Sequence, residues 1–161
     1  MKGLPAVIMT ALIASSCSKS STSTSTPPVA PTPATAAVAI TFDANPVTFS
    51  GSGCSFSTPQ GWFTQAKIQE TAGVAITVAT FTQKLDGNPA SALTESFNSR
   101  FGACSGGTFN AGAIAASGTV CGTVGVCTTS TYSTYQFSIA GTDANGHAVT
   151  FDSPLLRLNA R

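Results

Sequence analysis

The sequence carries very little charge. Only 8% of its 161 residues are Asp, Glu, Lys or Arg, whereas an average soluble domain has roughly 25%. Seven basic residues face six acidic ones, and loss of Lys2 with an N-terminal leader would make the two numbers equal. Such a surface is wetted by hydroxyl groups and backbone, and it lacks the basic footprint of a nucleic-acid-binding protein. We therefore expect no nucleic-acid partner.

Residues typical of catalytic and metal sites are also scarce. His147 is the only histidine, whereas a blue-copper site needs two histidines and a cysteine. The sequence has no C-x-x-C pair for zinc, no G-x-S-x-G elbow and no glycine-rich phosphate loop followed by Lys. His147 has no evident partner and lies beside a predicted turn, where a solvated surface residue is expected. These absences predict a protein that is not an enzyme and that holds no metal ion or cofactor.

The acidic residues stand singly, without the spacing that would indicate the paired carboxylates of a glycosidase. The sequence Asp143-Ala144-Asn145-Gly146 starts like a calcium-binding loop, but it lacks the further acidic ligands and the closing Glu. Asp and Asn followed by Gly are typical of tight turns between strands. We interpret this segment as a hairpin turn.

The N-terminus has the order of a secretory signal peptide. Met1 and Lys2 form a short positive region, and residues 4–14 form an apolar stretch that is too short to span a bilayer. The small residues Ser15 and Ser16 follow, as expected before a cleavage site. We expect residues 1–16 to be the signal peptide.

The sequence Ala14-Ser15-Ser16-Cys17 resembles the lipobox of bacterial lipoproteins. In that family, small residues let the signal peptidase approach, and the cysteine sulfur receives a diacylglycerol. Ala14 departs from the pattern, in which Leu usually stands three residues before the cysteine. The resemblance implies a protein exported to the bacterial cell envelope and anchored to a membrane through lipid on Cys17. The alternative is an ordinary A-x-A-like cleavage that leaves Cys17 as a stray thiol.

The stretch after Cys17 is dominated by Ser, Thr and Pro. Its sequence STSTSTPPVAPTPAT has almost no apolar side chains to bury, so it cannot offset the entropy of ordering. We expect residues 17–36 to form the lipidated N-terminus and a disordered linker, which would reach on the order of 25 to 60 Å. Such a spacer would hold the following domain, residues 37–161, clear of a membrane. The alternative is a disordered tract that merely precedes a secreted domain.

The five cysteines cannot all pair with one another. If Cys17 carries the lipid, four remain, an even number in an exported protein whose compartment is oxidising. Two disulfides among Cys54, Cys104, Cys121 and Cys127 are expected, with three possible pairings. We favour Cys121 with Cys127, because two glycines between them can close a tight loop. Cys54 with Cys104 then follows by elimination.

The rest of the chain has the pattern of half-buried strands. Apolar residues alternate with small or polar ones, and a period of two predicts sheets that are wet on one face. The segments with this pattern are 38–42, 47–49, 74–83, 135–143 and 147–151. Turn signals follow at 45–46, 72–73, 86–89 and 143–146. No long crossover helix is present, so we predict an all-β fold, an antiparallel sandwich of about seven strands.

The last two segments give the most specific expectation. Tyr135, Phe137 and Ile139 should face the opposite sheet. Val149 and Phe151 should point inward on the partner strand, because a hairpin must present one common apolar face.

One segment breaks the strand pattern. Asn88 is a candidate N-cap for a short helix that begins after it and carries Leu93 and Phe97.

The segment YQFSIAGTDANGHAVTF, residues 135–151, resembles the closing F and G strands of bacterial immunoglobulin-like domains. Those domains have an aromatic-alternating strand, an Asp-x-Asn-Gly turn and a β-branched return strand. The sequence FDANPV, residues 42–47, is similar to their first strand with its proline break. The resemblance implies a single immunoglobulin-like (Big-type) β-sandwich over about residues 37–159.

The chain departs from antibody-type domains around its cysteines. Cys54, Trp62 and Cys104 follow one another in the Cys-Trp-Cys order. However, Trp62 comes too soon after Cys54 for successive strands, and no Tyr stands two residues before Cys104. We therefore interpret the disulfide of Cys54 as a loop staple rather than the central bond between the sheets.

Two function classes remain for such a domain. The first is protein binding or cell-envelope assembly by a non-enzymatic, membrane-anchored lipoprotein, with a free sheet edge that pairs with a partner strand. The second is a carbohydrate-binding or adhesive module, which needs exposed aromatic side chains. The candidates for that role are Trp62, Phe63, Tyr132 and Tyr135. A buried Trp62 would remove the best of them.

Overall fold

The computed structural model describes residues 32–50, 54, 61–91, 93 and 95–160. The chain divides into two units, Met1–Pro31 and Thr32–Arg161, and every described residue belongs to the second. The expected signal peptide, Cys17 and most of the expected linker lie outside the described residues.

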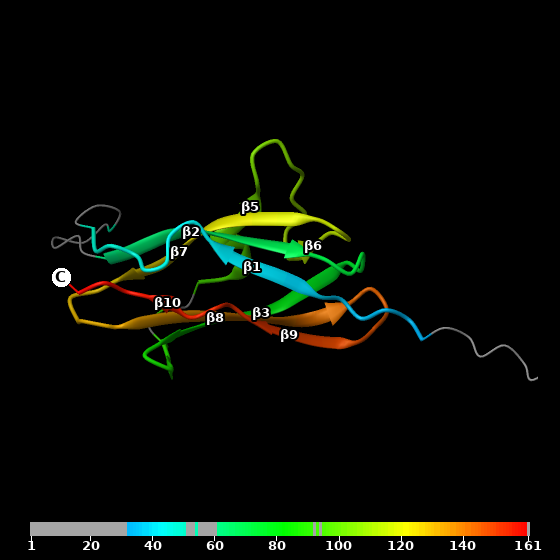
Figure 1. Cartoon of the computed structure of the whole chain (residues 1–161). Helices are drawn as coiled ribbons and strands as arrows, with labels where there is room; N and C mark the ends of the chain where they lie inside the picture. Colours follow the sequence, from blue (N-terminus) through cyan, green and yellow to red (C-terminus); the bar gives the residue numbers. More distant parts are fainter. Residues whose placement is uncertain (1–31, 51–53, 55–60, 92, 94, 161) are drawn as a thin grey trace, which may run out of the picture. The chain divides into compact units, whose positions relative to one another are not determined.

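Two antiparallel sheets make up the described unit, and Figure 1 shows them as separate layers. The first sheet has the order β1 (Val38–Phe42), β2 (Gly61–Glu70), β7 (Thr119–Cys127), β5 (Phe101–Ala103). The second has the order β10 (Leu156–Arg157), β8 (Thr134–Asp143), β3 (Ile76–Leu85), β4 (Asn88–Pro89). In addition, β6 (Ala113–Ile114) pairs with β3, and β9 (Ala148–Asp152) pairs with β8. The predicted all-β sandwich is confirmed.

The core lies between the two sheets, where the predicted alternation of β8 is confirmed. Tyr135, Phe137 and Ile139 are at most 1% exposed. On the partner strand, Val149 is buried and Phe151 is half-buried against the core. The hairpin of β8 and β9 therefore presents its apolar face to the first sheet.

The ring of Phe137 joins the two layers. Its centroid lies 6.1 Å from that of Phe42 on β1 and 5.6 Å from that of Phe101 on β5, the two edge strands of the first sheet. Within its own sheet it lies 5.5 Å from Phe81 and 6.5 Å from Tyr135. These separations are in the range of favourable aromatic pairs. One side chain thus contacts aromatic residues from both sheets.

The two central strands of the first sheet, β2 and β7, carry weak sequence signals. The inward face of β2 includes Thr64 and Glu70 among its buried residues, so apolar alternation is incomplete. On β7, glycines stand where neighbouring backbone approaches closely. A Cβ on Gly122 would collide with the carbonyl oxygen of Arg100, and one on Gly125 with that of Trp62. The two glycines expected to close a loop are therefore packing positions within a strand.

The helix predicted after Asn88 is wrong in position. Asp86 and Gly87 have φ values of 48° and 79°, which suit a two-residue hairpin turn, and the turn pairs Asn88 with Leu85 on β3. Asn88 therefore lies in β4. The helix α1 spans only Phe97–Arg100.

The proline break after β1 moves the chain from one sheet to the other. The Asn45–Pro46 peptide bond is cis. Val47 then forms a parallel bridge with Leu158: its N–H donates to Arg157 O at 2.8 Å, and its carbonyl accepts from Asn159 N at 2.9 Å. The strand predicted at 47–49 is thus reduced to one isolated bridge, that of Val47, at the edge of the second sheet, and Ser50 then bridges to Gly61 of β2 in the first sheet.

Replacement of Phe137 tests this core. Phe137→Ala should lower the free energy of unfolding by about 3 to 5 kcal/mol, because the large cavity would lie between both sheets. Ser138→Ala, on the opposite face of the same strand, should cost less than about 1 kcal/mol. Denaturant unfolding with intact disulfides measures both values. A larger loss for Ser138→Ala than for Phe137→Ala would contradict the observed direction of β8.

Candidate functional site

The four cysteines of the domain form two disulfides, but not the pairs favoured from sequence. Cys54 is bonded to Cys127 with a Cα–Cα distance of 5.7 Å, and Cys104 to Cys121 with a Cα–Cα distance of 4.9 Å. The predicted pairs, Cys121 with Cys127 and Cys54 with Cys104, are wrong.

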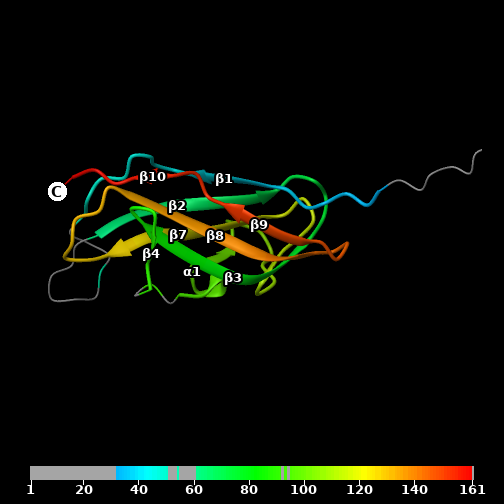
Figure 2. The same ribbon diagram turned by 90° about the horizontal axis from the view of Figure 1, so that it is seen from below.

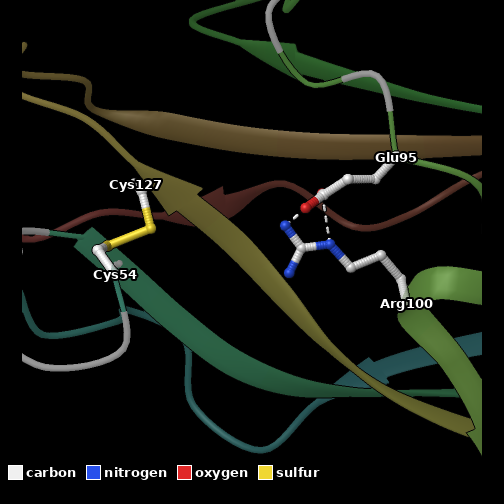
Figure 3. The surroundings of a disulfide bond; sticks show 4 residues. All are labelled: Cys54, Glu95, Arg100 and Cys127. Carbon is white, nitrogen blue, oxygen red and sulfur yellow. Dashed lines mark hydrogen bonds and ion pairs between the residues drawn. A yellow bond between two sulfur atoms is a disulfide. The ribbon is translucent and has the colours of Figure 1, made fainter. Parts of the chain in front are cut away.

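The extended conformation of β7 explains why Cys121 does not pair with Cys127. Cys121 and Cys127 both lie on this strand, six residues apart. At a rise of about 3.3 Å per residue their Cα atoms are roughly 20 Å apart, whereas a disulfide needs less than about 7 Å. Each cysteine therefore pairs elsewhere: Cys127 with Cys54, as Figure 3 shows, and Cys121 with Cys104 just beyond β5.

An ion pair lies near the first of these disulfides (Figure 3). Arg100, the last residue of α1, pairs with Glu95 and also donates to the carbonyl oxygen of Thr123 on β7 at 3.3 Å. The Glu95 side chain is 39% exposed, so solvent screens the pair and its contribution to stability is small. The hydrogen bond from Arg100 to Thr123 O connects the short helix to β7.

Asp143 organises the turn between β8 and β9. Its Oδ1 accepts from the backbone N–H groups of Asn145 and His147, both at 2.9 Å, and its Oδ2 lies 3.0 Å from His147 Nδ1. Oδ2 also accepts from the N–H of Ala36 at 3.1 Å, which ties the segment before β1 to this hairpin. Figure 2 shows that segment, in blue, running beside the orange hairpin. The predicted turn is confirmed, and Asp143 is the partner of His147 that sequence reasoning missed.

These hydrogen bonds set the pKa of Asp143. Burial raises its pKa, but the bonds from His147, Ala36 and Asn145 outweigh burial and lower it to about 2. The folded-state pKa lies below the unfolded value of roughly 4. The ionised carboxylate therefore stabilises the fold at pH values above 4, and this contribution is lost as the pH falls toward 2.

Glu70 is a second buried carboxylate with a similar role. It is 1% exposed, and its oxygens accept from the N–H groups of Ala72, Gly73 and Ser117, each at 2.8 Å. Burial raises the pKa of Glu70, but the backbone hydrogen bonds together lower it below its usual value. Glu70 thereby joins the turn after β2 to the turn before β7. Glu70 follows the alternation of inward-facing positions in β2, and this is the sequence feature that could have indicated its burial.

A third acid, Asp86, binds the start of β8, at the other end of this strand from Asp143. Its Oδ1 accepts from the N–H groups of Ser133 and Thr134 at 2.9 and 2.8 Å, and these bonds lower its pKa against the raising effect of burial. Three of the six acidic residues are therefore used as acceptors for backbone N–H groups of turns.

The aromatic candidates for sugar stacking are divided between core and surface. Trp62 is 1% exposed and donates from Nε1 to the carbonyl oxygen of Asn159 at 2.8 Å. Tyr135 is buried, and its hydroxyl donates to Gln83 at 2.7 Å. Phe63 and Tyr132 are half-buried. The best of the predicted stacking residues, Trp62, belongs to the core.

An open groove of about 490 Å³ lies between the edge strands of the two sheets. One wall carries Val38 and Ile40 of β1, and the other carries Thr150 to Asp152 of β9 with the following Ser153 and Pro154. A smaller groove of about 220 Å³ lies near Tyr132 and Cys127. His147 lines neither of them. The larger groove joins two sheet edges and is the candidate functional site.

The chain matches no protein-family model, no curated protein and no solved structure. Among the residues that the structure describes, no three His, Cys, Asp or Glu side chains form a cluster that could hold a metal ion. Among the same residues there is no helix of the length and apolar character that crosses a bilayer.

The low pKa of Asp143 makes stability depend on pH. Between about pH 4 and pH 2, the unfolding temperature of the wild type should fall more steeply than that of Asp143→Asn, because the variant has no carboxylate to protonate. Thermal unfolding followed by circular dichroism across this pH range measures the slopes. Equal slopes for the wild type and Asp143→Asn would contradict the role given to Asp143.

Proposed function

We propose that this protein is a bacterial cell-envelope lipoprotein that is anchored through Cys17 and displays a non-enzymatic domain for protein binding or envelope assembly. The observation that carries the proposal is the cysteine pairing. Cys54, Cys104, Cys121 and Cys127 are bonded to one another. Cys17 therefore has no cysteine left to pair with in its own chain, and it stands directly after the signal-like segment.

The domain itself is proposed to be immunoglobulin-like. The orders β1-β2-β7-β5 and β9-β8-β3 correspond to the A-B-E-D and G-F-C orders of constant-type immunoglobulin domains. The passage of the chain from β1 to the parallel bridge of Val47 supports the same reading, because it matches the proline-broken first strand of the resemblance.

The path of the chain before β1 supports a tether. Asn145 donates to the carbonyl oxygen of Ala34 at 2.6 Å, and Asp143 accepts from Ala36. Two points on the β8–β9 hairpin thus hold the last residues of the expected linker. A force on a lipid anchor would reach the domain at this hairpin, beside the larger groove.

Protein binding is favoured over sugar binding by the burial of the aromatic side chains. Trp62 and Tyr135 are in the core and unavailable for stacking on a sugar ring. The larger groove, in contrast, combines apolar side chains with strand edges, which are the elements of strand-addition binding.

Lipid attachment tests the anchoring proposal. Metabolic labelling with a radioactive fatty acid in a bacterial host should mark the wild type and should not mark Cys17→Ser, because the sulfur is the acceptor. Ser18→Ala is the matched control and should retain the label. Label on Cys17→Ser, or a mature N-terminus other than residue 17, would contradict the proposal.

A further inference from the structure

We propose that the groove between β1 and β9 binds an extended strand of a partner polypeptide, which pairs with β9 as an added edge strand of the second sheet. The inference rests on the proposed function and names the kind of partner that the displayed domain takes. Its apolar side chains would fill the groove against Val38, Ile40 and Phe151.

The backbone of β9 offers the hydrogen-bonding groups for such a strand. His147 O and Ser153 N bond to β8, which fixes the alternation between these residues. In an antiparallel pair only alternate residues bond to the neighbouring strand. The N–H and C=O groups of Ala148, Thr150 and Asp152 therefore point away from β8, and within the described part of the chain no hydrogen bond of theirs leads elsewhere. These three N–H and three C=O groups could pair with the backbone of an extended strand.

The opposite wall of the groove supplies contacts for side chains. Val38 and Ile40 are partly buried against the core, whereas Ala39 and Thr41 between and beside them are exposed, so the side chains of Val38 and Ile40 point toward the inner face of the sheet. Both are half-buried, as is Phe151 on the β9 side. A strand added to β9 would place every second side chain between these residues. Apolar residues at alternate positions of the partner would then replace water in the groove.

The other strands at the ends of the sheets are short. Among the described residues, β5 has three residues and is joined to β7 by the Cys104–Cys121 disulfide. The edge strands β4 and β6 have two residues each. Short or covered edges are how β-proteins avoid unwanted pairing. In contrast, β1 and β9 each have five residues and flank the same groove.

An extended segment of the protein's own chain already pairs on this side of the second sheet. Both β9 and β10 lie on the same side of β8, and Val47 bonds to the chain at Leu158, directly after β10. A partner strand on β9 would add to the same side of the second sheet as Val47, which pairs near β10. The Val47 bridge shows that a backbone adds to this side of the sheet at Leu158, and the proposal extends that addition to β9.

The charge of the groove indicates the composition of the partner. Asp152 is the one charged residue among those that line it, and it is exposed. The remaining lining residues are apolar or neutral. A partner with Val, Ile or Phe at alternate positions, Thr between them, and one Lys or Arg near Asp152 fits this surface. A second copy of the chain is the competing occupant, but neither β1 nor β9 contains a basic residue to meet Asp152.

Synthetic peptides test the proposal on the full chain. The probes are fluorescent seven-residue peptides with Val, Ile or Phe at alternate positions, Thr between them and one Lys, and fluorescence anisotropy measures binding. Methylation of the backbone nitrogens of one alternate set of residues should abolish binding, and methylation of the other set should leave it. The reason is that only one edge of the peptide pairs with β9. Absence of binding, or equal binding of both methylated peptides, would overturn the proposal.

A proline on β9 provides the matching test in the protein. Thr150→Pro removes an outward N–H without removing a bond to β8, and it should weaken peptide binding by about tenfold or more. Thr150→Val keeps the N–H and should bind like the wild type. Thermal unfolding establishes that each variant is folded, and the methylated peptides give an answer even if Thr150→Pro does not fold. Undiminished binding to folded Thr150→Pro would overturn the proposal.

Hydrogen exchange separates the possible occupants. Addition of peptide should slow exchange at Ala148, Thr150 and Asp152 and leave Gly102 on β5 unchanged. Protection of these amides without peptide, together with dimers in sedimentation, would overturn the proposal in favour of a second copy. Peptide binding does not depend on lipid attachment, so its failure leaves the labelling of Cys17 unaffected, and loss of labelling leaves peptide binding unaffected.

Discussion

The full extension of β7 is the constraint on which the rest of the structure depends. This strand lies between β2 and β5 and carries one cysteine of each disulfide. Because Cys121 and Cys127 lie six residues apart on an extended strand, they cannot reach one another and must bind separate parts of the chain. The two bonds use every cysteine of the domain, which leaves Cys17 for another chemistry. The geometry of one strand thus connects the fold to the proposed anchor.

The scarcity of charge also has a structural consequence. Glu70, Asp86 and Asp143 accept hydrogen bonds from backbone N–H groups at turns and strand ends, and Asp143 also pairs with the His147 side chain. Charged acceptors make stronger hydrogen bonds than neutral ones, so a single carboxylate can hold a turn in place. Asp143 has the widest effect, because it joins the β8–β9 hairpin to the segment before β1. That contact places the expected tether beside the groove proposed to bind a partner.

The sequence predicts the fold best where one face is strongly apolar. The alternation of Phe137 and its neighbours predicted the direction of β8, and the sequence of residues 143–146 predicted the hairpin turn after it; both are confirmed. The apolar pattern is weaker in β2 and β7, because several inward positions there hold Thr, Glu or Gly, whose roles depend on backbone brought close by folding. A bulge between Val78 and Thr80 likewise reverses the alternation of β3. The groove could not be predicted, because it joins β1 and β9, which are more than 100 residues apart in the chain. Cys17 and its lipid remain predictions.

The pairing of the cysteines tests most directly whether β7 is extended and whether Cys17 is left without a cysteine partner. The measurement is mass spectrometry of peptides from the full chain, digested without reduction after alkylation of free thiols. The expected result is that Cys54 is linked to Cys127 and Cys104 to Cys121, with no alkylated cysteine in residues 32–161. A Cys121–Cys127 link would contradict an extended β7, and with it the elimination that leaves Cys17 as the lipid acceptor.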